Sequence, residues 1–150
     1  MQLAFAKARE GIAAGQTPFG ACIAKNGEPI VCAHNNVWRS VDSTAHAEMV
    51  AIREACIELG TIDLAGCAIY STTEPCPMCF AACHWAKISK IVFGARIEDA
   101  KRFGFSELAI SNMDMKRLGG SHMIIEVDFM RSESLALFES WAARFDKRTY

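Results

Sequence analysis

Two short segments hold the residue types of a metal site with a proton carrier beside it. The first is His46-Ala47-Glu48 and the second is Pro75-Cys76-Pro77-Met78-Cys79. One imidazole and two thiolates are ligands that zinc prefers, and because zinc favours tetrahedral geometry they leave one position for water. An open position is typical of a catalytic metal. Glu48 is a harder ligand than a thiolate, so we interpret it as the base that takes a proton from that water.

Both segments are predicted to lie at the start of a helix. Residues two apart on a helix point about 200° away from each other, so His46 and Glu48 converge only if a helix begins at about His46. Apolar residues then recur at helical spacing until Gly60. Pro77 suits the first position of a second helix, which Cys76 therefore caps. Three good N-cap residues precede the first helix, namely Asp42, Ser43 and Thr44.

The rest of the chain alternates between strand-like and helix-like segments. Alternation predicts a mixed α/β sheet with helices on both faces and ligands where strands pass into helices. The connection over 98–120 has no clear register and is compatible with helix, loop or lid. The predicted helices cover 1–14, 46–59, 77–87 and 132–147, and the predicted strands cover 19–25, 29–35, 67–71, 90–94 and 123–128.

The bulk properties indicate a single domain over 1–150, without repeats or linkers. A formal net charge of −1 supplies no overall field that would attract nucleic acid, which favours a small substrate. No apolar run reaches membrane-spanning length. Seven cysteines, an odd number, and the lack of a secretory leader predict a reducing, cytoplasmic location. Four of them are expected to be buried as small apolar residues of the core, namely Cys22, Cys32, Cys56 and Cys67.

With these residues in place, the chain resembles the cytidine deaminase-like superfamily of zinc-dependent nucleobase deaminases along nearly its whole length. Within it, the chain is most similar to the bacterial guanine deaminases. The resemblance implies a three-layer α/β/α sandwich around a five-stranded mixed sheet, one zinc ion per chain and a homodimer. It also implies His46, Cys76 and Cys79 as zinc ligands and Glu48 as the proton shuttle. The similar segments are Thr17-Pro18-Phe19-Gly20-Ala21, Asn35-Asn36-Val37, Thr44-Ala45-His46-Ala47-Glu48 and Trp85-Ala86.

The same resemblance implies which residues contact the base. Aromatic side chains flank the planar ring, which suits Phe19 and Trp85, and an amide hydrogen-bonds it, which suits Asn35. From the residues alone, both aromatics are equally suited to the core, and Asn35 to capping a loop. The implied contacts are Phe19, Asn35, Ala47, Trp85, Glu107 and Tyr150.

Two of these contacts leave the identity of the base open. Guanine-specific relatives carry two acidic residues after Gly-Phe, whereas this chain has Ser106 and Glu107 there. The Glu107 carboxylate can still accept from the amino and ring N–H groups of guanine, and a solvated surface charge is the alternative. Tyr150 ends a tail that closes over the active site in those relatives, sometimes from the partner subunit. A frayed terminus is the alternative for Tyr150.

The predicted activity is hydrolytic deamination of a nucleobase, with guanine converted to xanthine and ammonia. Another free base such as isocytosine has the same amino and carbonyl arrangement and is an alternative. A tRNA adenosine deaminase shares both metal segments, but the only dense basic cluster here is Arg144, Lys147 and Arg148. A structural zinc module is a further alternative, in which Cys83 or His84 completes the coordination sphere.

Overall fold

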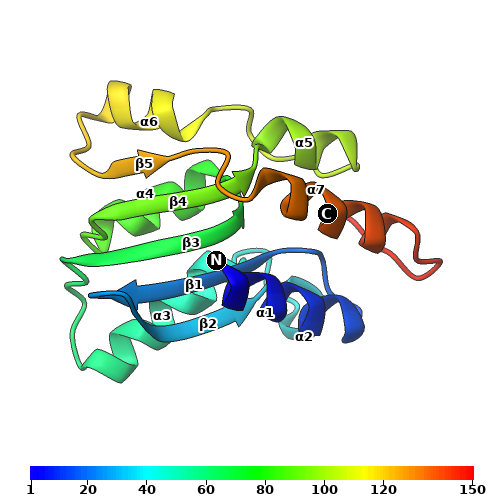
Figure 1. Cartoon of the computed structure of the whole chain (residues 1–150), viewed down its shortest axis with the longest axis horizontal. Helices are drawn as coiled ribbons and strands as arrows, with labels where there is room; N and C mark the ends of the chain where they lie inside the picture. Colours follow the sequence, from blue (N-terminus) through cyan, green and yellow to red (C-terminus); the bar gives the residue numbers. More distant parts are fainter.

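The computed structural model describes residues 1–150 and is built on one five-stranded sheet. The strand order is β2-β1-β3-β4-β5. β1 runs antiparallel to both β2 and β3, whereas β3, β4 and β5 are parallel, so the predicted mixed sheet is confirmed (Figure 1). The strands are β1 (Gly20–Lys25), β2 (Glu28–His34), β3 (Cys67–Thr73), β4 (Lys90–Ala95) and β5 (Ile124–Glu126).

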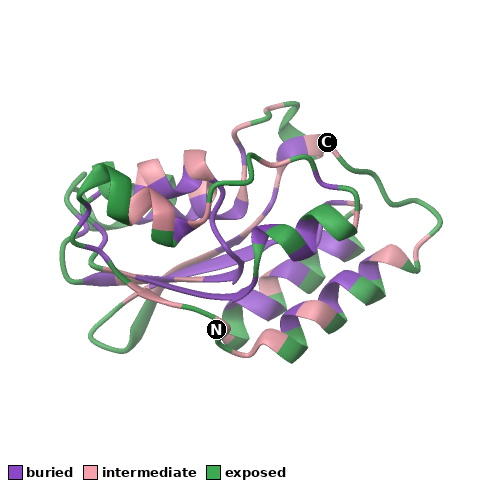
Figure 2. Cartoon of the chain, turned by 90° about the horizontal axis from the view of Figure 1, so that it is seen from above, coloured by how far each residue is buried: buried purple, intermediate pink, exposed green.

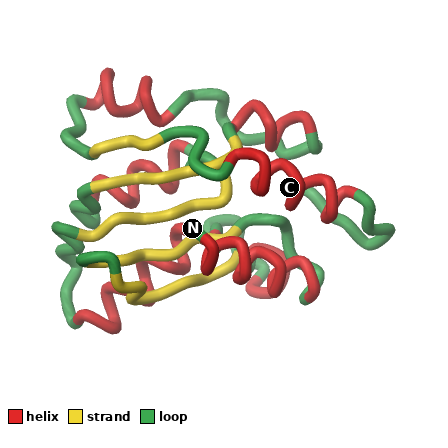
Figure 3. The backbone as a smooth tube through the Cα atoms, viewed as in Figure 1, coloured by secondary structure: helices red, strands yellow, loops and turns green.

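Helices cover both faces of this sheet, which completes the three-layer sandwich (Figure 3). α1 (Gln2–Ala13) and α7 (Arg131–Ala142) lie on one face and contact each other. α3 (Ala47–Leu59) and α4 (Pro77–Trp85) lie on the opposite face, and they also contact each other. Three shorter helices complete the fold, namely α2 (Val37–Ser40), α5 (Ile97–Arg102) and α6 (Asn112–Gly119).

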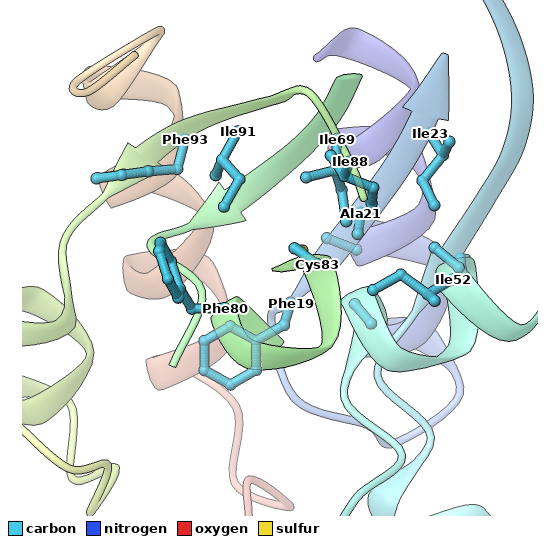
Figure 4. Close-up of a cluster of buried hydrophobic side chains, with 14 of the residues drawn as sticks. Phe19, Ala21, Ile23, Ile52, Ile69, Phe80, Cys83, Ile88, Ile91 and Phe93 are labelled. Atoms are coloured by element: carbon cyan, nitrogen blue, oxygen red, sulfur yellow. The ribbon is translucent and has the colours of Figure 1, made fainter. Parts of the chain in front are cut away.

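The main apolar core lies between the sheet and the α3–α4 layer. Alternate strand residues point to the same face, so Ile23, Ile69 and Ile91 meet the helices together. α4 contributes Phe80 and Cys83 to this cluster (Figure 4). A fully buried aliphatic side chain contributes about 1.5–3 kcal/mol. Figure 2 shows the resulting arrangement, with buried residues along the strands and the inner helix faces and exposed residues on the outer turns.

Most predicted elements are present, with differences at their ends. The connection over 98–120 contains α5 and α6 with an irregular segment between them. The last helix ends at Ala142 and not near Lys147, and the short α2 was not predicted because four residues carry no periodicity. The N-cap of α3 is His46 itself. Asp42 instead closes a local turn by accepting a hydrogen bond from the amide of Thr44 at 2.8 Å.

The structure corrects one expectation about the cysteines. Cys22 of β1 and Cys32 of β2 lie opposite each other and form a disulfide, so they are not free core residues. Cys56 and Cys67 are free, and Cys67 is buried as expected, whereas Cys56 is only partly buried. None of the helices combines the length and the apolar character needed to cross a bilayer.

Candidate active site

The starts of α3 and α4 bring three metal-binding side chains together. His46 and Cys76 are the N-caps of these helices, and Cys79 lies one turn into α4. The Nδ1 atom of His46 lies 3.6 Å from each of the two Sγ atoms, which are themselves 3.6 Å apart. A tetrahedral zinc ion with metal–ligand distances of about 2.0–2.3 Å requires ligand atoms about 3.3–3.8 Å apart. The donor set and its spacing therefore fit one zinc ion.

The thiol of Cys76 is prepared to act as a thiolate. Its Sγ atom lies 3.6 Å from the Sγ of Cys79, within hydrogen-bond distance, and 3.6 Å from the Nδ1 of His46. These contacts lower the pKa of Cys76 to about 4. A thiolate is the form of cysteine that binds metal.

Glu48 is a buried carboxyl group beside the metal ligands. It lies in the first turn of α3 and is 5% exposed. Its Oε1 atom accepts a hydrogen bond of 2.7 Å from the hydroxyl of Ser71, and its Oε2 atom lies 3.6 Å from the Sγ of Cys79. Burial raises the pKa of Glu48. The side chain is therefore oriented toward the ligand set and holds a proton more readily than an exposed glutamate does.

A pocket of ≈ 240 Å³ opens next to the ligand set. Its lining includes His46, Cys76, Glu107 and Tyr150. Burial, aided by the negative charge of Cys76, raises the pKa of Glu107 to about 8. The Oε2 atom of Glu107 has no hydrogen-bond partner in the protein. Glu107 thus offers the pocket a carboxyl group that can donate as well as accept a hydrogen bond.

The C-terminus folds over the pocket of its own chain. The Nδ2 group of the buried Asn35 donates a hydrogen bond of 2.6 Å to the hydroxyl of Tyr150. The ring of Tyr150 lies 5.5 Å from that of His46. Two residues earlier, the guanidinium of Arg148 lies over the ring of Trp38 at 4.6 Å. The tail is therefore anchored both inside and outside the pocket.

Ala47 lies at the rim of the ligand set as the first residue of α3. Its amide hydrogen has no acceptor within the helix, because the first amides of a helix lack a carbonyl one turn earlier. Ala47 is fully buried and does not line the pocket, so its contact with a base stays a prediction.

The structure does not bring the two predicted aromatic residues to the pocket. Phe19 is 6% exposed and packs edge-on against Phe105 and Phe138, with ring centroids 4.7 and 5.7 Å away. Trp85 is 83% exposed at the end of α4. Six residues after Cys79, it points about 240° around the helix from that ligand. We therefore correct the expectation that Phe19 and Trp85 flank a base within this chain.

Neither residue proposed to close the coordination sphere joins the ligand set. The group that can hold one ion consists of His46, Cys76 and Cys79. Cys83 is fully buried among apolar side chains one turn deeper in α4, and His84 is exposed. His46, Cys76 and Cys79 would therefore hold the ion, and His46 and Cys76 also line the pocket.

Sequence reasoning missed two residues that support the site. Ser71, which holds Glu48, follows Ile69 on the same face of β3, and the period of two along this strand could have revealed it. Glu74 is buried between β3 and Cys76. The sequence signal for Glu74 was its position as a charged residue directly after the apolar strand β3.

Comparisons with known proteins agree with this geometry. Residues 1–95 match the family model described as the cytidine and deoxycytidylate deaminase zinc-binding region. A guanine deaminase of Bacillus subtilis is 38% identical over 142 residues, covering 94% of this chain and 90% of the relative. A tRNA-specific adenosine deaminase of Aquifex aeolicus is 46% identical over 95 residues, covering 63% of each chain. The structure of a guanine deaminase from Nitrosomonas europaea superposes with a TM-score of 0.88 at 29% identity, covering 95% of this chain and 82% of that one.

Proposed function

Because the chain belongs to the cytidine and deoxycytidylate deaminase family of zinc-dependent enzymes, we propose that it hydrolyses guanine to xanthine and ammonia. The observation that carries the choice of a small free base is the position of Tyr150, whose hydroxyl bonds to Asn35 beside the pocket. A pocket closed by the tail of the chain suits a base that is enclosed completely. The similarity to a guanine deaminase covers 94% of this chain and therefore includes the region of Glu107, which supports the same choice.

The chemistry follows from the residues around the pocket. Zinc held by His46, Cys76 and Cys79 supplies activation of a water at neutral pH. Glu48 takes a proton from this water as its oxygen bonds to C2 of guanine. The same carboxyl group passes this proton to N3, then takes the remaining proton from the hydroxyl now on C2 and gives it to the departing amino group. The C2–N bond breaks, ammonia leaves, and the carbonyl of xanthine remains.

Three groups are proposed to hold the base in place. The Nδ2 atom of Asn35 carries two hydrogens, so one remains for the base while the other bonds to Tyr150. The backbone amide of Ala47 is a further donor at the helix start. Glu107 lines the pocket, and its carboxyl group is proposed to meet the N–H groups of guanine. These contacts involve hydrogen-bonding groups on the edge of the base. Guanine and adenine differ in these groups, so the contacts would distinguish the two bases.

We also propose that the enzyme is a homodimer and works in a reducing, cytoplasmic environment. Two large apolar side chains on the neighbouring helices α4 and α6 support a subunit contact, because Trp85 is 83% exposed and Leu118 is 72% exposed. Cys76 and Cys79 must stay reduced to bind metal, which supports the compartment, and we propose that the Cys22–Cys32 disulfide, which such a compartment disfavours, is reduced there. Sedimentation equilibrium with a Trp85→Ala variant tests the dimer, which the variant should weaken.

Ammonia release across a panel of substrates tests the proposed reaction. The panel contains guanine, isocytosine, cytosine, adenine, their nucleosides and an anticodon stem-loop. We expect release from guanine and none from the stem-loop. Turnover of the stem-loop, with a steep salt dependence, would instead identify a tRNA adenosine deaminase. Turnover of isocytosine without guanine would show that the pocket selects a single pyrimidine ring.

A further inference from the structure

A buried carboxylate joins the metal-binding turn to two helix starts. Glu74, two residues before Cys76, is 6% exposed. Its Oε1 atom accepts a hydrogen bond of 2.7 Å from the amide of Asn112, and its Oε2 atom accepts one of 3.2 Å from the amide of Ile97. These are the first residues of α6 and α5, whose amides have no acceptor within their own helices. Glu74 therefore fixes the starts of both helices to the turn that carries Cys76.

The side chain of Asn112 adds a second link to the same turn. Asn112 is fully buried, and its Nδ2 group donates a hydrogen bond of 2.6 Å to the carbonyl oxygen of Pro75. The N-cap of α6 is already supplied by Ser111, whose hydroxyl accepts from the amide of Asp114. Asn112 is thus not needed to cap its helix. Its backbone and its side chain both hold the residues immediately before Cys76.

The segment between these two anchored helices carries Glu107. Residues 103–111 connect α5 to α6 along one side of the molecule, beyond β4 (Figure 1). Glu74 binds the first residue of α5, the helix that precedes this connection, and the first residue of α6, which directly follows it, while the middle of the connection lines the pocket together with His46 and Cys76. A change in these bonds shifts Glu107 relative to the metal ligands.

We propose that Glu74 and Asn112 are positioning residues that set the distance between Glu107 and the zinc ligands. This inference rests on the proposed function only in that Glu107 contacts the base. A misplacement of about 1 Å in a reacting group costs up to roughly 10²-fold in rate. The three hydrogen bonds of Glu74 and Asn112 at the turn therefore influence turnover without touching the substrate.

A double-mutant cycle tests the proposal. Asn112→Ala should lower kcat/KM roughly ten- to hundredfold in the wild-type background. It should have less than about a twofold effect in a Glu107→Gln background, because Glu107 is the group that Asn112 positions. Ser111→Ala is the matched control, since it weakens the same helix but leaves the link to Pro75 intact. An equal loss in both backgrounds, or an equal loss in Ser111→Ala, overturns the proposal.

A second readout needs no substrate. The rate of zinc transfer to a coloured chelator should rise several-fold in Asn112→Ala and stay unchanged in Ser111→Ala, because only the first variant loosens the residue before Cys76. If Asn112→Ala does not fold, Glu74→Gln, which keeps the size of the side chain, replaces it in both assays. Unchanged zinc release together with unchanged turnover overturns the proposal. The cycle uses whichever base the wild type deaminates, so a lack of guanine turnover refutes the substrate alone.

Discussion

Glu48 depends on its surroundings more than any other residue of the site. Its carboxyl group is buried, and the hydroxyl of Ser71 orients Oε1 so that Oε2 faces the ligand set. Burial raises its pKa toward the range in which a carboxyl group both takes and gives a proton. A single hydrogen bond and a low-dielectric environment thus suit this glutamate to the proposed role of proton carrier.

Glu48→Gln should abolish turnover and keep the metal. Removing a general acid–base group costs typically 10²–10⁴-fold in rate, and the three ligands are untouched. The neutral amide also avoids the burial of a charge, so the variant should unfold at the same temperature or above it. Steady-state kinetics, zinc content and a thermal unfolding curve check this. Loss of zinc would show that Glu48 is a metal ligand.

Cys83→Ser should keep zinc but lower stability. Cys83 lies outside the ligand set in the apolar core, where a hydroxyl without a partner costs about 1–3 kcal/mol. We expect one zinc per chain, unchanged kcat and a lower midpoint of urea unfolding. Ala82→Ser, at a partly buried position next to it, is the control. A zinc-free variant would support a structural zinc module instead.

At the scale of elements, local signals predicted the helix starts, and long-range contacts decided the rest. Pro77 and Gly60 mark the start of α4 and the end of α3 through their own backbone preferences, so the metal site was accessible from the sequence. The Cys22–Cys32 disulfide depends on a register shift after Ile23, without which Cys22 would lie opposite another residue. No local pattern reveals such a shift.

The C-terminal tail shows the same limit, since its contacts lie far apart in the sequence. Tyr150 reaches Asn35, and Phe19 turns away from the pocket because it packs against aromatic residues of the last third of the chain. Spacing within a segment carries no information about either contact. The resemblance implied base contacts for both Tyr150 and Phe19, but only the packing of the folded chain determines which of the two side chains lines the pocket.

Arg148→Ala should loosen this tail and weaken binding of the base. The cation–π contact with Trp38 contributes about 0.5–1 kcal/mol at an exposed site, which corresponds to a roughly two- to fivefold rise in KM. The chemical groups are unaffected, so kcat should stay within about twofold. Arg144→Ala is the matched control, because Arg144 pairs with Asp146 outside the pocket. Equal KM values for both variants would show that the contact between Arg148 and Trp38 does not hold the tail.

At the scale of the whole molecule, the helix layers on both faces of the sheet contribute to one site. The α3–α4 layer supplies His46, Cys76, Cys79 and Glu48, whereas α7 on the opposite face leads into the tail that ends at Tyr150. The position of α7 on the sheet therefore sets where the tail begins. That position depends on Gly94 of β4, which lies directly beneath Ser134 of α7.

Gly94→Ala should disturb the site from this distance. A Cβ atom at Gly94 would collide with the hydroxyl of Ser134 and lie 2.9 Å from its Cβ, so α7 must move outward. Overpacking of this kind costs typically 1–3 kcal/mol. Because the tail follows α7, KM for the base should rise as the free energy of unfolding falls.

The second substitution Ser134→Gly removes both colliding atoms and should restore much of the stability and bring KM back toward its original value. Urea unfolding and steady-state kinetics on the single and double variants check this. A normal KM in a clearly destabilised Gly94→Ala variant would mean that the tail finds the pocket independently of α7.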